Sequence, residues 1–425
     1  PRFPEIVGFD ETVLPQLERA LLAGHDVVLL GERGQGKTRL IRSLVSLLDE
    51  WTPVVDGCEI NDHPDAPACG GCRARLETLG DDLPVGWRHR RERYGEKLAT
   101  PDTSVGDLIG DVDPMKVAAG RTLGDPETVH YGLVPRTNRG IFSVNELPDL
   151  AERIQVALLN VLEERDIQVR GYQLRLPLDL LLVASANPED YTNRGRIITP
   201  LKDRFGAEIR THYPLRLDDE LALIRQEAHL GAALVPEHLV EVIARFTRAV
   251  REAPQVDARS GVSARFAITG TETLAAAAVR RAALAGEENP VARVVDLGAV
   301  VPTCRGKVEF DQLEEGREGE ILSHLLRRAV ADTYRARLAG ADLSGVLARF
   351  ADDASVETGE LVPAAELLRR VGPVPGLAKL LERLGDRGAE SPGLAAAAIE
   401  FAMEGLHLSK RLAKDELPGR TVYGG

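Results

Sequence analysis

Short apolar runs alternate with stretches of helical periodicity over residues 1 to about 214 of this 425-residue chain. The strand candidates are residues 25–30, 53–55, 141–144, 178–185 and 207–211. Strands that alternate with helices along a sequence are typical of an α/β domain built on a parallel sheet. The hydrophobic pattern therefore predicts this fold class for the first half of the chain.

After Pro214 the strand-like runs stop, and apolar residues recur at helical spacing instead. Helices are predicted over residues 216–252, 262–285, 318–338 and 342–416. The last region is interrupted by a Pro-Gly cluster at 372–376 and by the Gly- and Pro-rich stretch 385–393. Residues 286–316 show no clear period, which indicates a loop or an insertion.

The chain is longer than a single domain usually is, so we expect more than one. We place an α/β core at residues 1–214, with an insertion over about 56–130. A helical region at 215–340 and a C-terminal helical region at 341–425 follow it. Hydrophobic residues make up 44% of the sequence, which is enough to build substantial cores.

The formal net charge of −13 argues against a general nucleic-acid-binding surface, although it leaves room for a local basic pore. No apolar stretch approaches the ~20 residues of a membrane span. No signal peptide is visible. We therefore expect a cytoplasmic protein, without a membrane contact, whose partners are proteins or small molecules.

Residues 31–38 read GERGQGKT, which matches the G-x-x-x-x-G-K-[ST] pattern of a phosphate-binding loop. The apolar run 25–30 precedes it and a stretch of helical period over 39–48 follows it, as the motif requires. Glycines let backbone N–H groups approach phosphate oxygens closely, and Lys37 would reach the β- and γ-phosphates. Thr38 would place its hydroxyl on Mg²⁺. The motif predicts ATP and Mg²⁺ as ligands.

A second nucleotide motif occupies residues 141–146, which read IFSVNE. In such a site a buried parallel strand ends in two acidic residues, of which one helps to hold Mg²⁺ and the next polarises the attacking water. Glu146 occupies the second position, whereas Asn145 stands where the first carboxylate is expected. The amide oxygen of Asn145 can still accept a hydrogen bond from a metal-bound water, but without negative charge it should hold the metal more weakly.

These motifs together resemble those of AAA+ ATPases, closest to the magnesium-chelatase ATPase subunit (subunit I) and its MoxR-type relatives. The resemblance extends over roughly the first 340 residues. The matching segments are FPEIVG at 3–8 for the adenine contact, GL at 132–133 and RGI at 139–141 before the second motif, ASANP at 184–188 for sensor 1, LKDRF at 201–205 for the arginine finger and SAR at 263–265 for sensor 2. The departure from the family is Asn145. The implied fold is an AAA+ phosphate-loop core, an α-helical lid and a C-terminal helical region.

The resemblance also implies roles for individual residues. Glu146 would activate water, and Asn187 would read the γ-phosphate and the attacking water. Arg204 would arrive from a neighbouring subunit, and Arg265 would close the lid onto ATP. The full nucleotide-binding set comprises Ile6, Val7, Gly8, Gly31, Glu32, Arg33, Gly34, Gln35, Gly36, Lys37, Thr38, Arg39, Asn145 and Arg265.

Two of the implied arginine roles have alternatives. Arg194 and Arg196 are rivals of Arg204 as the arginine contributed by the next subunit. Arg204 could equally be a surface residue paired with Asp203, and Arg265 a residue on a helix surface.

Residues 166–177 alternate in polarity on both sides of Arg170-Gly171, the pattern of a β-hairpin. It resembles the pre-sensor-1 hairpin of this AAA+ group, which lines the pore of the ring or contacts the substrate. Arg170 and Tyr172 would lie at its tip, where they could grip a peptide or a phosphate backbone. A purely structural hairpin is the alternative.

Three of the four cysteines lie close together in the predicted insertion. Cys69 and Cys72 form a C-x₂-C motif, whose spacing lets two thiolates bind one tetrahedral zinc ion. Cys58 would supply a third ligand. A metal could fold a loop that lacks a core of its own.

The fourth zinc ligand is open. His63 is the nearest candidate, with His89 and Asp62 as rivals. Free buried thiols and redox chemistry are the alternatives to a zinc site, although a cytoplasmic disulfide is rare. Cys304 is isolated and is predicted to be a packing residue.

The sequence thus predicts an ATP hydrolase that forms a homo-oligomeric ring, hexameric on the family pattern, and hydrolyses ATP at subunit interfaces to remodel a protein partner. The family pairs such a subunit with a protein that carries a von Willebrand A domain. This chain has no D-x-S-x-S metal site of that kind, so the partner is expected to be a separate protein.

Three alternatives stay open. The chain could be a true chelatase motor that drives metal into a tetrapyrrole. It could be a transcriptional activator ATPase, a class that carries a GAFTGA-like loop and a DNA-binding tail, neither of which we find. It could also be a nucleotide-gated scaffold that hydrolyses little ATP because of Asn145, although Glu146 is retained.

Overall fold

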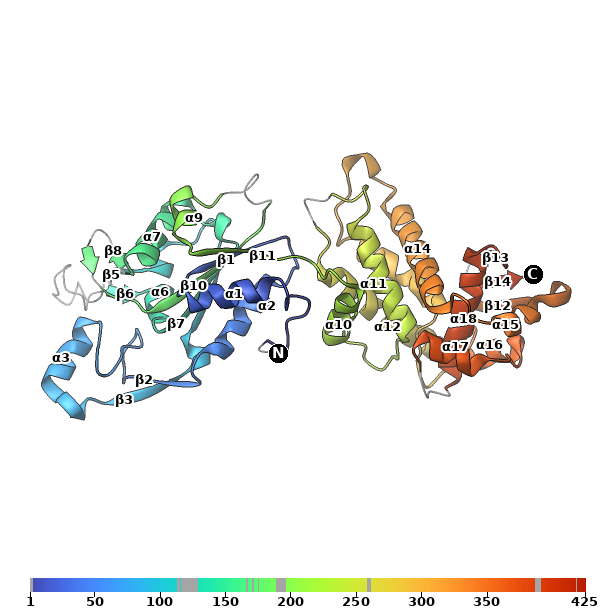
Figure 1. Ribbon diagram of the computed structural model, residues 1–425, viewed down its shortest axis with the longest axis horizontal. Helices are drawn as coiled ribbons and strands as arrows, with labels where there is room; N and C mark the ends of the chain where they lie inside the picture. The colour runs from blue at the N-terminus through green and yellow to red at the C-terminus, as the bar shows by residue number, and fades with distance from the viewer. Residues whose placement is uncertain are drawn as a thin grey trace. The chain divides into compact units, whose positions relative to one another are not determined.

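The computed structural model describes residues 3–112, 115, 129–165, 167–169, 172–174, 176–188, 196–257, 261–386, 391–417 and 419–425. Two compact units make up the chain, Pro1–Tyr213 and Pro214–Gly425 (Figure 1). Each unit has hydrophobic core clusters of its own. The first unit is an α/β structure and the second is mainly helical.

A five-stranded parallel sheet forms the centre of the first unit. Its strands are β1 (Val27–Leu30), β4 (Tyr94–Leu98), β7 (Gly140–Asn145), β10 (Leu180–Ala186) and β11 (Ala207–Arg210), in the spatial order β11-β1-β10-β7-β4. The sheet separates two core clusters, because Val28 and Leu30 pack on one face while Val27 and Leu29 pack on the other. Strands buried on both faces read as continuous apolar runs, which is why the hydrophobic pattern reveals most of them.

Helices of the first unit supply apolar side chains to both core clusters. Helices α1 (Val13–Leu22) and α2 (Lys37–Ser43) contribute to the cluster that holds Val27. Helices α7 (Glu152–Glu163) and α9 (Thr199–Arg204) contribute to the cluster that holds Val28. Further elements of this unit are α3 (Gly70–Leu79), α4 (Val105–Leu108), α6 (Leu133–Arg136), β5 (Gly110–Val112) and β6 (Val129–Tyr131).

Residues 53–55 form a strand as predicted, but not a strand of the central sheet. They belong to β2 (Trp51–Val55), which pairs antiparallel with β3 (Val85–His89). The strand that lies beside β7 at one edge of the central sheet is instead β4, which the hydrophobic pattern did not predict. Glu96 and Lys97 interrupt its apolar character, as is common where a strand is only partly covered.

The predicted hairpin between the second motif and sensor 1 is confirmed, since β8 (Ile167–Val169) pairs antiparallel with β9 (Tyr172–Leu174). Arg170, Gly171 and the side chain of Tyr172 lie outside the described residues. The contact of the hairpin tip with a peptide or a phosphate backbone therefore stays a prediction.

The second unit is built mainly from helices around a large core cluster. They are α10 (Leu217–Glu227), α11 (Glu237–Arg251), α12 (Ala264–Ala285), α13 (Val300–Arg305), α14 (Glu318–Leu338), α15 (Ser344–Leu347), α16 (Ala364–Val371), α17 (Leu377–Leu384) and α18 (Pro392–Leu408). The predicted interruptions at 372–376 and 385–393 separate α16, α17 and α18. The core extends from Leu221 to Tyr423, so both predicted helical regions share it.

Strands also occur after Pro214, which corrects the prediction that they stop there. Strands β12 (Ser355–Gly359), β14 (Arg420–Gly424) and β13 (Ala413–Leu417) form a three-stranded antiparallel sheet. Strand β13 reads AKDEL and is largely exposed, and Tyr423 is the fully buried residue of β14. Such strands carry too little apolar alternation for the sequence to reveal them.

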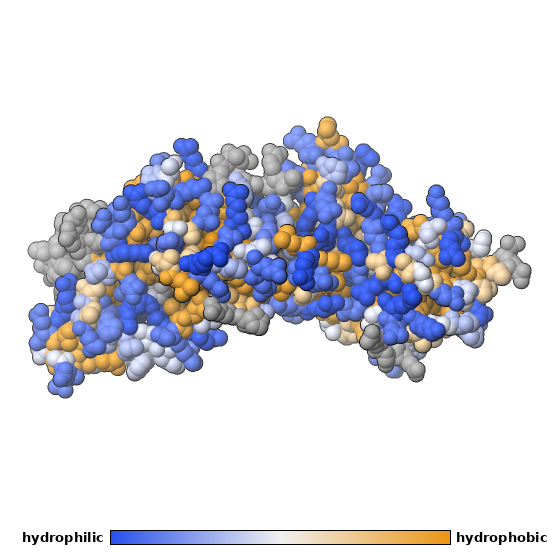
Figure 2. All heavy atoms as spheres, in the orientation of Figure 1, coloured by the Kyte–Doolittle hydropathy of each residue, from blue (hydrophilic) through white to orange (hydrophobic). Residues whose placement is uncertain are grey.

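No helix among the described residues is long and apolar enough to cross a lipid bilayer. Figure 2 shows hydrophilic side chains over much of the face in view, with hydrophobic ones scattered between them. Scattered apolar side chains are normal on a protein surface and need no special explanation.

Candidate active site

The loop of residues 31–36 connects β1 to α2 at the carboxyl end of β1. Gly34 and Gly36 have φ angles of 72° and 77°, in the left-handed region that favours glycine. At Gly31 a Cβ would lie only 2.0 Å from Oγ1 of Thr211, so a side chain would collide there. The backbone therefore requires the glycines of the phosphate-loop motif.

Lys37 is the first residue of α2, and its side chain is buried. Its ammonium donates hydrogen bonds to the carbonyl oxygens of Gly31 and Glu32, the latter at 2.8 Å. A third bond, at 2.7 Å, reaches Oδ1 of Asn187. These acceptors hold the positive charge beside the glycine loop.

Glu146 and Asn187 follow the carboxyl ends of β7 and β10, two neighbouring strands of the sheet. Nδ2 of Asn187 donates to Oε2 of Glu146 at 2.7 Å, while its Oδ1 accepts the bond from Lys37. The structure thus brings together three predicted site residues in one hydrogen-bonded series of ammonium, amide and carboxylate. Ligands of open α/β sheets bind beside the carboxyl ends of the strands.

The backbone of Glu146 is strained. Its φ is 56°, a left-handed conformation that is uncommon for residues other than glycine. The hydroxyl of Ser185, on the neighbouring strand, accepts the N–H of Glu146 at 3.3 Å. Strained backbone of this kind clusters at functional sites, where the surrounding structure holds it in place.

Asn145 is buried and hydrogen-bonded at both ends of its amide. Its Nδ2 donates to Oε1 of Glu96 at 2.7 Å, and its Oδ1 accepts from the hydroxyl of Ser185 at 3.3 Å. Glu96 also accepts two hydrogen bonds of 2.8 Å from Arg42, which lower the pKa of its carboxyl. Sequence reasoning missed Glu96, because only the strand order shows that β4 lies beside β7.

Other contacts fix the glycine loop against β11 and the segment after it. Oγ1 of Thr211 donates to Oε1 of Gln35 at 2.8 Å, and the hydroxyl of Tyr213 donates to the carbonyl of Arg33 at 2.8 Å. Neither Thr211 nor Tyr213 was predicted to belong to the site. Their polar groups support the loop conformation rather than replace a predicted ligand.

Apart from Arg265, the remaining residues of the predicted nucleotide-binding set belong to the first unit. Ile6 is buried in the same core cluster as Leu40 of α2, and Gly8 has a φ of 78°. The half-buried members of the set are Val7, Gly8, Glu32, Gly34, Thr38 and Arg39. This placement leaves their contact with a nucleotide as a prediction.

The predicted arginines are in different surroundings. The side chain of Arg204 is 35% exposed and makes two hydrogen bonds to Glu163 of α7, at 3.0 and 3.1 Å, and one to Asp203 at 3.3 Å. Arg196 is exposed, and Arg194 lies outside the described residues. Arg265 is exposed near the start of α12 in the second unit.

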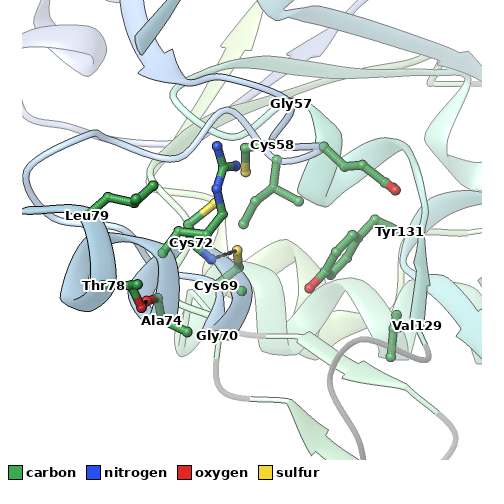
Figure 3. Close-up of a pocket in the computed structure, with 14 residues that line it drawn as sticks. Gly57, Cys58, Cys69, Gly70, Cys72, Ala74, Thr78, Leu79, Val129 and Tyr131 are labelled. Atoms are coloured by element: carbon green, nitrogen blue, oxygen red, sulfur yellow. Dashed lines mark hydrogen bonds between the residues drawn. The ribbon is translucent and has the colours of Figure 1, made fainter. Parts of the chain in front are cut away.

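The cysteine cluster lies in the first unit, in the segment between β2 and β3 and beside a pocket of about 690 Å³ (Figure 3). Ligand atoms of Cys58, Asp62, Cys69 and Cys72 all lie within 4.8 Å of one another. The thiol of Cys69 hydrogen-bonds to Cys58 and lowers its pKa to about 6, whereas burial raises the pKa of Cys72 to about 12.

The structure does not bring His63 into this cluster. Its side chain is 43% exposed, and its Nδ1 accepts the N–H of Asp65 at 3.1 Å. The neighbouring carboxylate of Asp62, one of the rival candidates, occupies the fourth position instead. The residues are adjacent in sequence but their side chains diverge, which spacing alone does not reveal.

Known proteins share part of this sequence. The chain is 27% identical over 349 residues to magnesium-chelatase subunit ChlI-2, chloroplastic, of Arabidopsis thaliana, a match that covers 76% of this chain and 78% of that protein. It is 30% identical over 241 residues to the magnesium-chelatase 38 kDa subunit of Acidiphilium rubrum, covering 53% of this chain and 62% of the relative. The chain is a homologue of these magnesium-chelatase subunits.

The match to the bacterial magnesium-chelatase subunit spans less than two thirds of that relative's length. The family described as Sigma-54 interaction domain matches residues 122–204, which include Asn145, Glu146, Asn187 and Arg204. The parallel sheet with its phosphate loop, followed by a helical unit, is the AAA+ architecture that the resemblance implies.

Two solved structures are also similar to the chain. One is the complex between subunits BchI and BchD of magnesium chelatase, with 22% identity, coverage of 76% of this chain and 98% of that chain, and a TM-score of 0.39. The other is the Thermotoga maritima RuvB Holliday junction branch migration motor, with 15% identity, coverage of 99% and 95%, and a TM-score of 0.38.

Proposed function

We propose that the chain is a ring-forming AAA+ ATPase that hydrolyses ATP at subunit interfaces to remodel a protein partner. The observation that carries this proposal is the hydrogen-bonded series from Lys37 through Asn187 to Glu146. It joins a phosphate-binding cation to a water-activating carboxylate through an amide that contacts both. Phosphate release from ATP by the purified chain with Mg²⁺ tests the proposal, and no release above buffer would overturn it.

The residues of the loop fit a triphosphate and Mg²⁺ chemically. At Gly36 no atom lies within 4 Å of the position a Cβ would take, so the backbone there is open to a ligand. Thr38, in the first turn of α2, offers a hydroxyl oxygen of the kind Mg²⁺ prefers. Bound Mg²⁺ would neutralise negative charge that develops on the phosphates.

The side chains of the site divide the chemical work. Glu146 would accept a proton from the attacking water, since its carboxylate follows the carboxyl end of β7 and is joined through Asn187 to Lys37. Asn187 would orient that water, and Lys37 would exchange its bonds to loop carbonyls for bonds to phosphate oxygens. Because Asn187 contacts both charged groups, it would couple the presence of phosphate to the position of Glu146.

Arg204 would complete the site of a neighbouring subunit. Its pairing with Glu163 is exposed, and exposed ion pairs are weak because water screens them, so little opposes its transfer to a phosphate. By family resemblance, we propose a separate protein with a von Willebrand A domain as the partner. Capture of such a protein by an ATP-locked Glu146→Gln ring tests that assignment.

A nucleotide-gated scaffold with little hydrolysis is the second candidate, and the contacts of Asn145 favour it. Its amide donates to Glu96 and accepts from Ser185, so position 145 offers the metal no carboxylate. Turnover at saturating Mg²⁺ separates the two candidates. Homology also favours a chelatase motor, which co-purification with a large porphyrin-binding subunit would support.

Replacing Asn145 with aspartate is expected to lower the Mg²⁺ concentration that gives half-maximal ATPase activity. The substitution adds a carboxylate at the end of β7, and carboxylates hold Mg²⁺ more strongly than amides do. Without metal, the new carboxylate would face Glu96, which now accepts from Asn145 at 2.7 Å, so the metal-free protein should lose stability.

Magnesium titrations of the wild type and the variant measure this shift, and thermal denaturation with and without Mg²⁺ measures the stability. Asn160→Asp, which changes an asparagine of α7 outside the site, is the control. An unchanged midpoint would mean that residue 145 does not face the metal.

A further inference from the structure

We propose that Cys58, Asp62, Cys69 and Cys72 bind one zinc ion that folds the segment between β2 and β3. Their ligand atoms all lie within 4.8 Å of one another. Around tetrahedral zinc with Zn–S bonds of about 2.3 Å, ligand atoms stand roughly 3.8 Å apart, so a small contraction would complete the shell. Figure 3 shows the sulfur atoms of the three cysteines gathered beside the start of α3.

The C-x₂-C motif is already arranged to hold a metal. Sγ of Cys69 caps α3 by accepting the N–H of Cys72 at 3.3 Å. This contact holds the sulfur of Cys69 at the start of the helix, on the same side as the thiol of Cys72. All four cysteines lie in the described part of the chain and carry free thiols.

Asp62 supplies the oxygen ligand and also fixes the loop that carries Cys69. Its Oδ1 and Oδ2 accept backbone N–H groups of Ala68 and Cys69, at 3.0 and 2.9 Å. Each oxygen keeps a second lone pair for a metal. The carboxylate is 1% exposed, and a divalent cation would offset the repulsion between this buried charge and nearby thiolates.

Helix α3 has little apolar packing to hold it. Of its ten residues only Cys72 is buried, and the helix lines a pocket of about 690 Å³ together with Val129 and Tyr131. The segment joins the core of the first unit through Cys58, Ile60, Cys72 and Leu83, so hydrophobic burial holds its ends more than the helix itself. Zinc binding would supply the missing stabilisation, as it does in other small metal-folded loops.

Hydrogen bonds join the segment between β2 and β3 to the residues that precede β7, the strand before Glu146. Nδ2 of Asn138 donates to the carbonyl of Ile60 at 3.1 Å, and Nδ2 of Asn61 donates to the carbonyl of Arg136 at 2.9 Å. Residues 136–139 lead directly into β7. Loss of the metal should therefore loosen the start of β7 as well as the segment that carries the cysteines.

Metal analysis of the purified chain tests the site. We expect about one zinc ion per chain, and less than about half an equivalent would overturn the proposal. The double variant Cys69→Ser, Cys72→Ser should lose the zinc. Cys304→Ser removes a buried thiol in the second unit and should retain all of it, so it controls for thiol loss alone.

Chelation of the wild-type chain gives a readout that does not depend on whether a variant folds. Removal of zinc should expose residues 56–83 to protease and make Cys58, Cys69 and Cys72 reactive, and added zinc should reverse both effects. An unchanged cleavage pattern, or a disulfide among these cysteines in protein purified under reducing conditions, would overturn the proposal.

The variant Asp62→Asn tests the fourth ligand separately. It keeps the three thiols and one side-chain oxygen, but removes the negative charge. Zinc affinity should fall by at least about tenfold in competition with a chelating indicator. Unchanged affinity would remove Asp62 from the metal site.

Discussion

ATP binding is expected to be lost when Lys37 is replaced with alanine. The substitution deletes the buried ammonium that the loop carbonyls and Asn187 hold beside the glycine loop. Hydrogen bonds to charged groups contribute about 1.5–3 kcal/mol each, and two of them to phosphate oxygens convert to a loss of at least about 100-fold in affinity. Calorimetric titration with ATP measures the change.

A matched control is Lys97→Ala, which removes a lysine of the same unit whose ammonium lies 3.8 Å from Asp107. This variant should bind ATP as the wild type does. Unchanged ATP affinity in the Lys37 variant would refute the assignment of residues 31–38 as the phosphate loop.

Replacing Glu146 with glutamine is expected to stop hydrolysis while ATP binding persists. Glutamine has the same shape and can still accept the hydrogen bond from Asn187, now 2.7 Å, but it cannot take a proton from water. General-base catalysis contributes about 10²–10⁴ in rate, so turnover should fall by at least about 100-fold. Steady-state phosphate release and ATP affinity together measure the two effects.

The exposed Glu152 of α7 provides the control, since Glu152→Gln makes the same chemical change outside the site. Equal turnover in the Glu146 variant and the wild type would remove Glu146 from the reaction. Loss of ATP binding as well would mean that Glu146 supports the loop rather than acting on water.

The position of the glycine loop between a strand and a helix could be predicted from the sequence, because the motif and both flanking elements are contiguous in the chain. Lys37 follows the glycines directly, and the strand and helix on either side are strongly apolar. Glu146 and Asn187 could be placed as well, since each follows a buried apolar strand. The left-handed backbone of Glu146 could not be predicted, because neighbouring strands rather than local preference impose it.

The contacts that were missed depend on pairings far apart in the chain. Glu96 bonds to Asn145 across 49 positions and to Arg42 across 54, and only the strand order brings them together. In the second unit, Arg293 and Glu400 form a fully buried ion pair at 2.7 Å. Charged residues are usually exposed, so their burial in a core could not be read from hydrophobic periodicity.

Arg204→Ala should lower turnover by about 10³ or more if Arg204 acts on the phosphate of a neighbouring subunit. The exposed Arg210 of β11 provides a control, because Arg210→Ala removes the same charge a short distance along the chain. Turnover equal to the wild type in the Arg204 variant would leave Arg194 and Arg196 as the remaining candidates.

Mixing two inactive variants tests the intersubunit site most directly. Glu146→Gln chains keep Arg204, and Arg204→Ala chains keep Glu146, so a mixed ring pairs both intact residues at about a quarter of its interfaces. Equimolar mixtures should therefore recover about a quarter of the wild-type ATPase rate. Mixtures that demonstrably co-assemble, yet hydrolyse no more ATP than the separate variants, would contradict hydrolysis at a site shared between subunits.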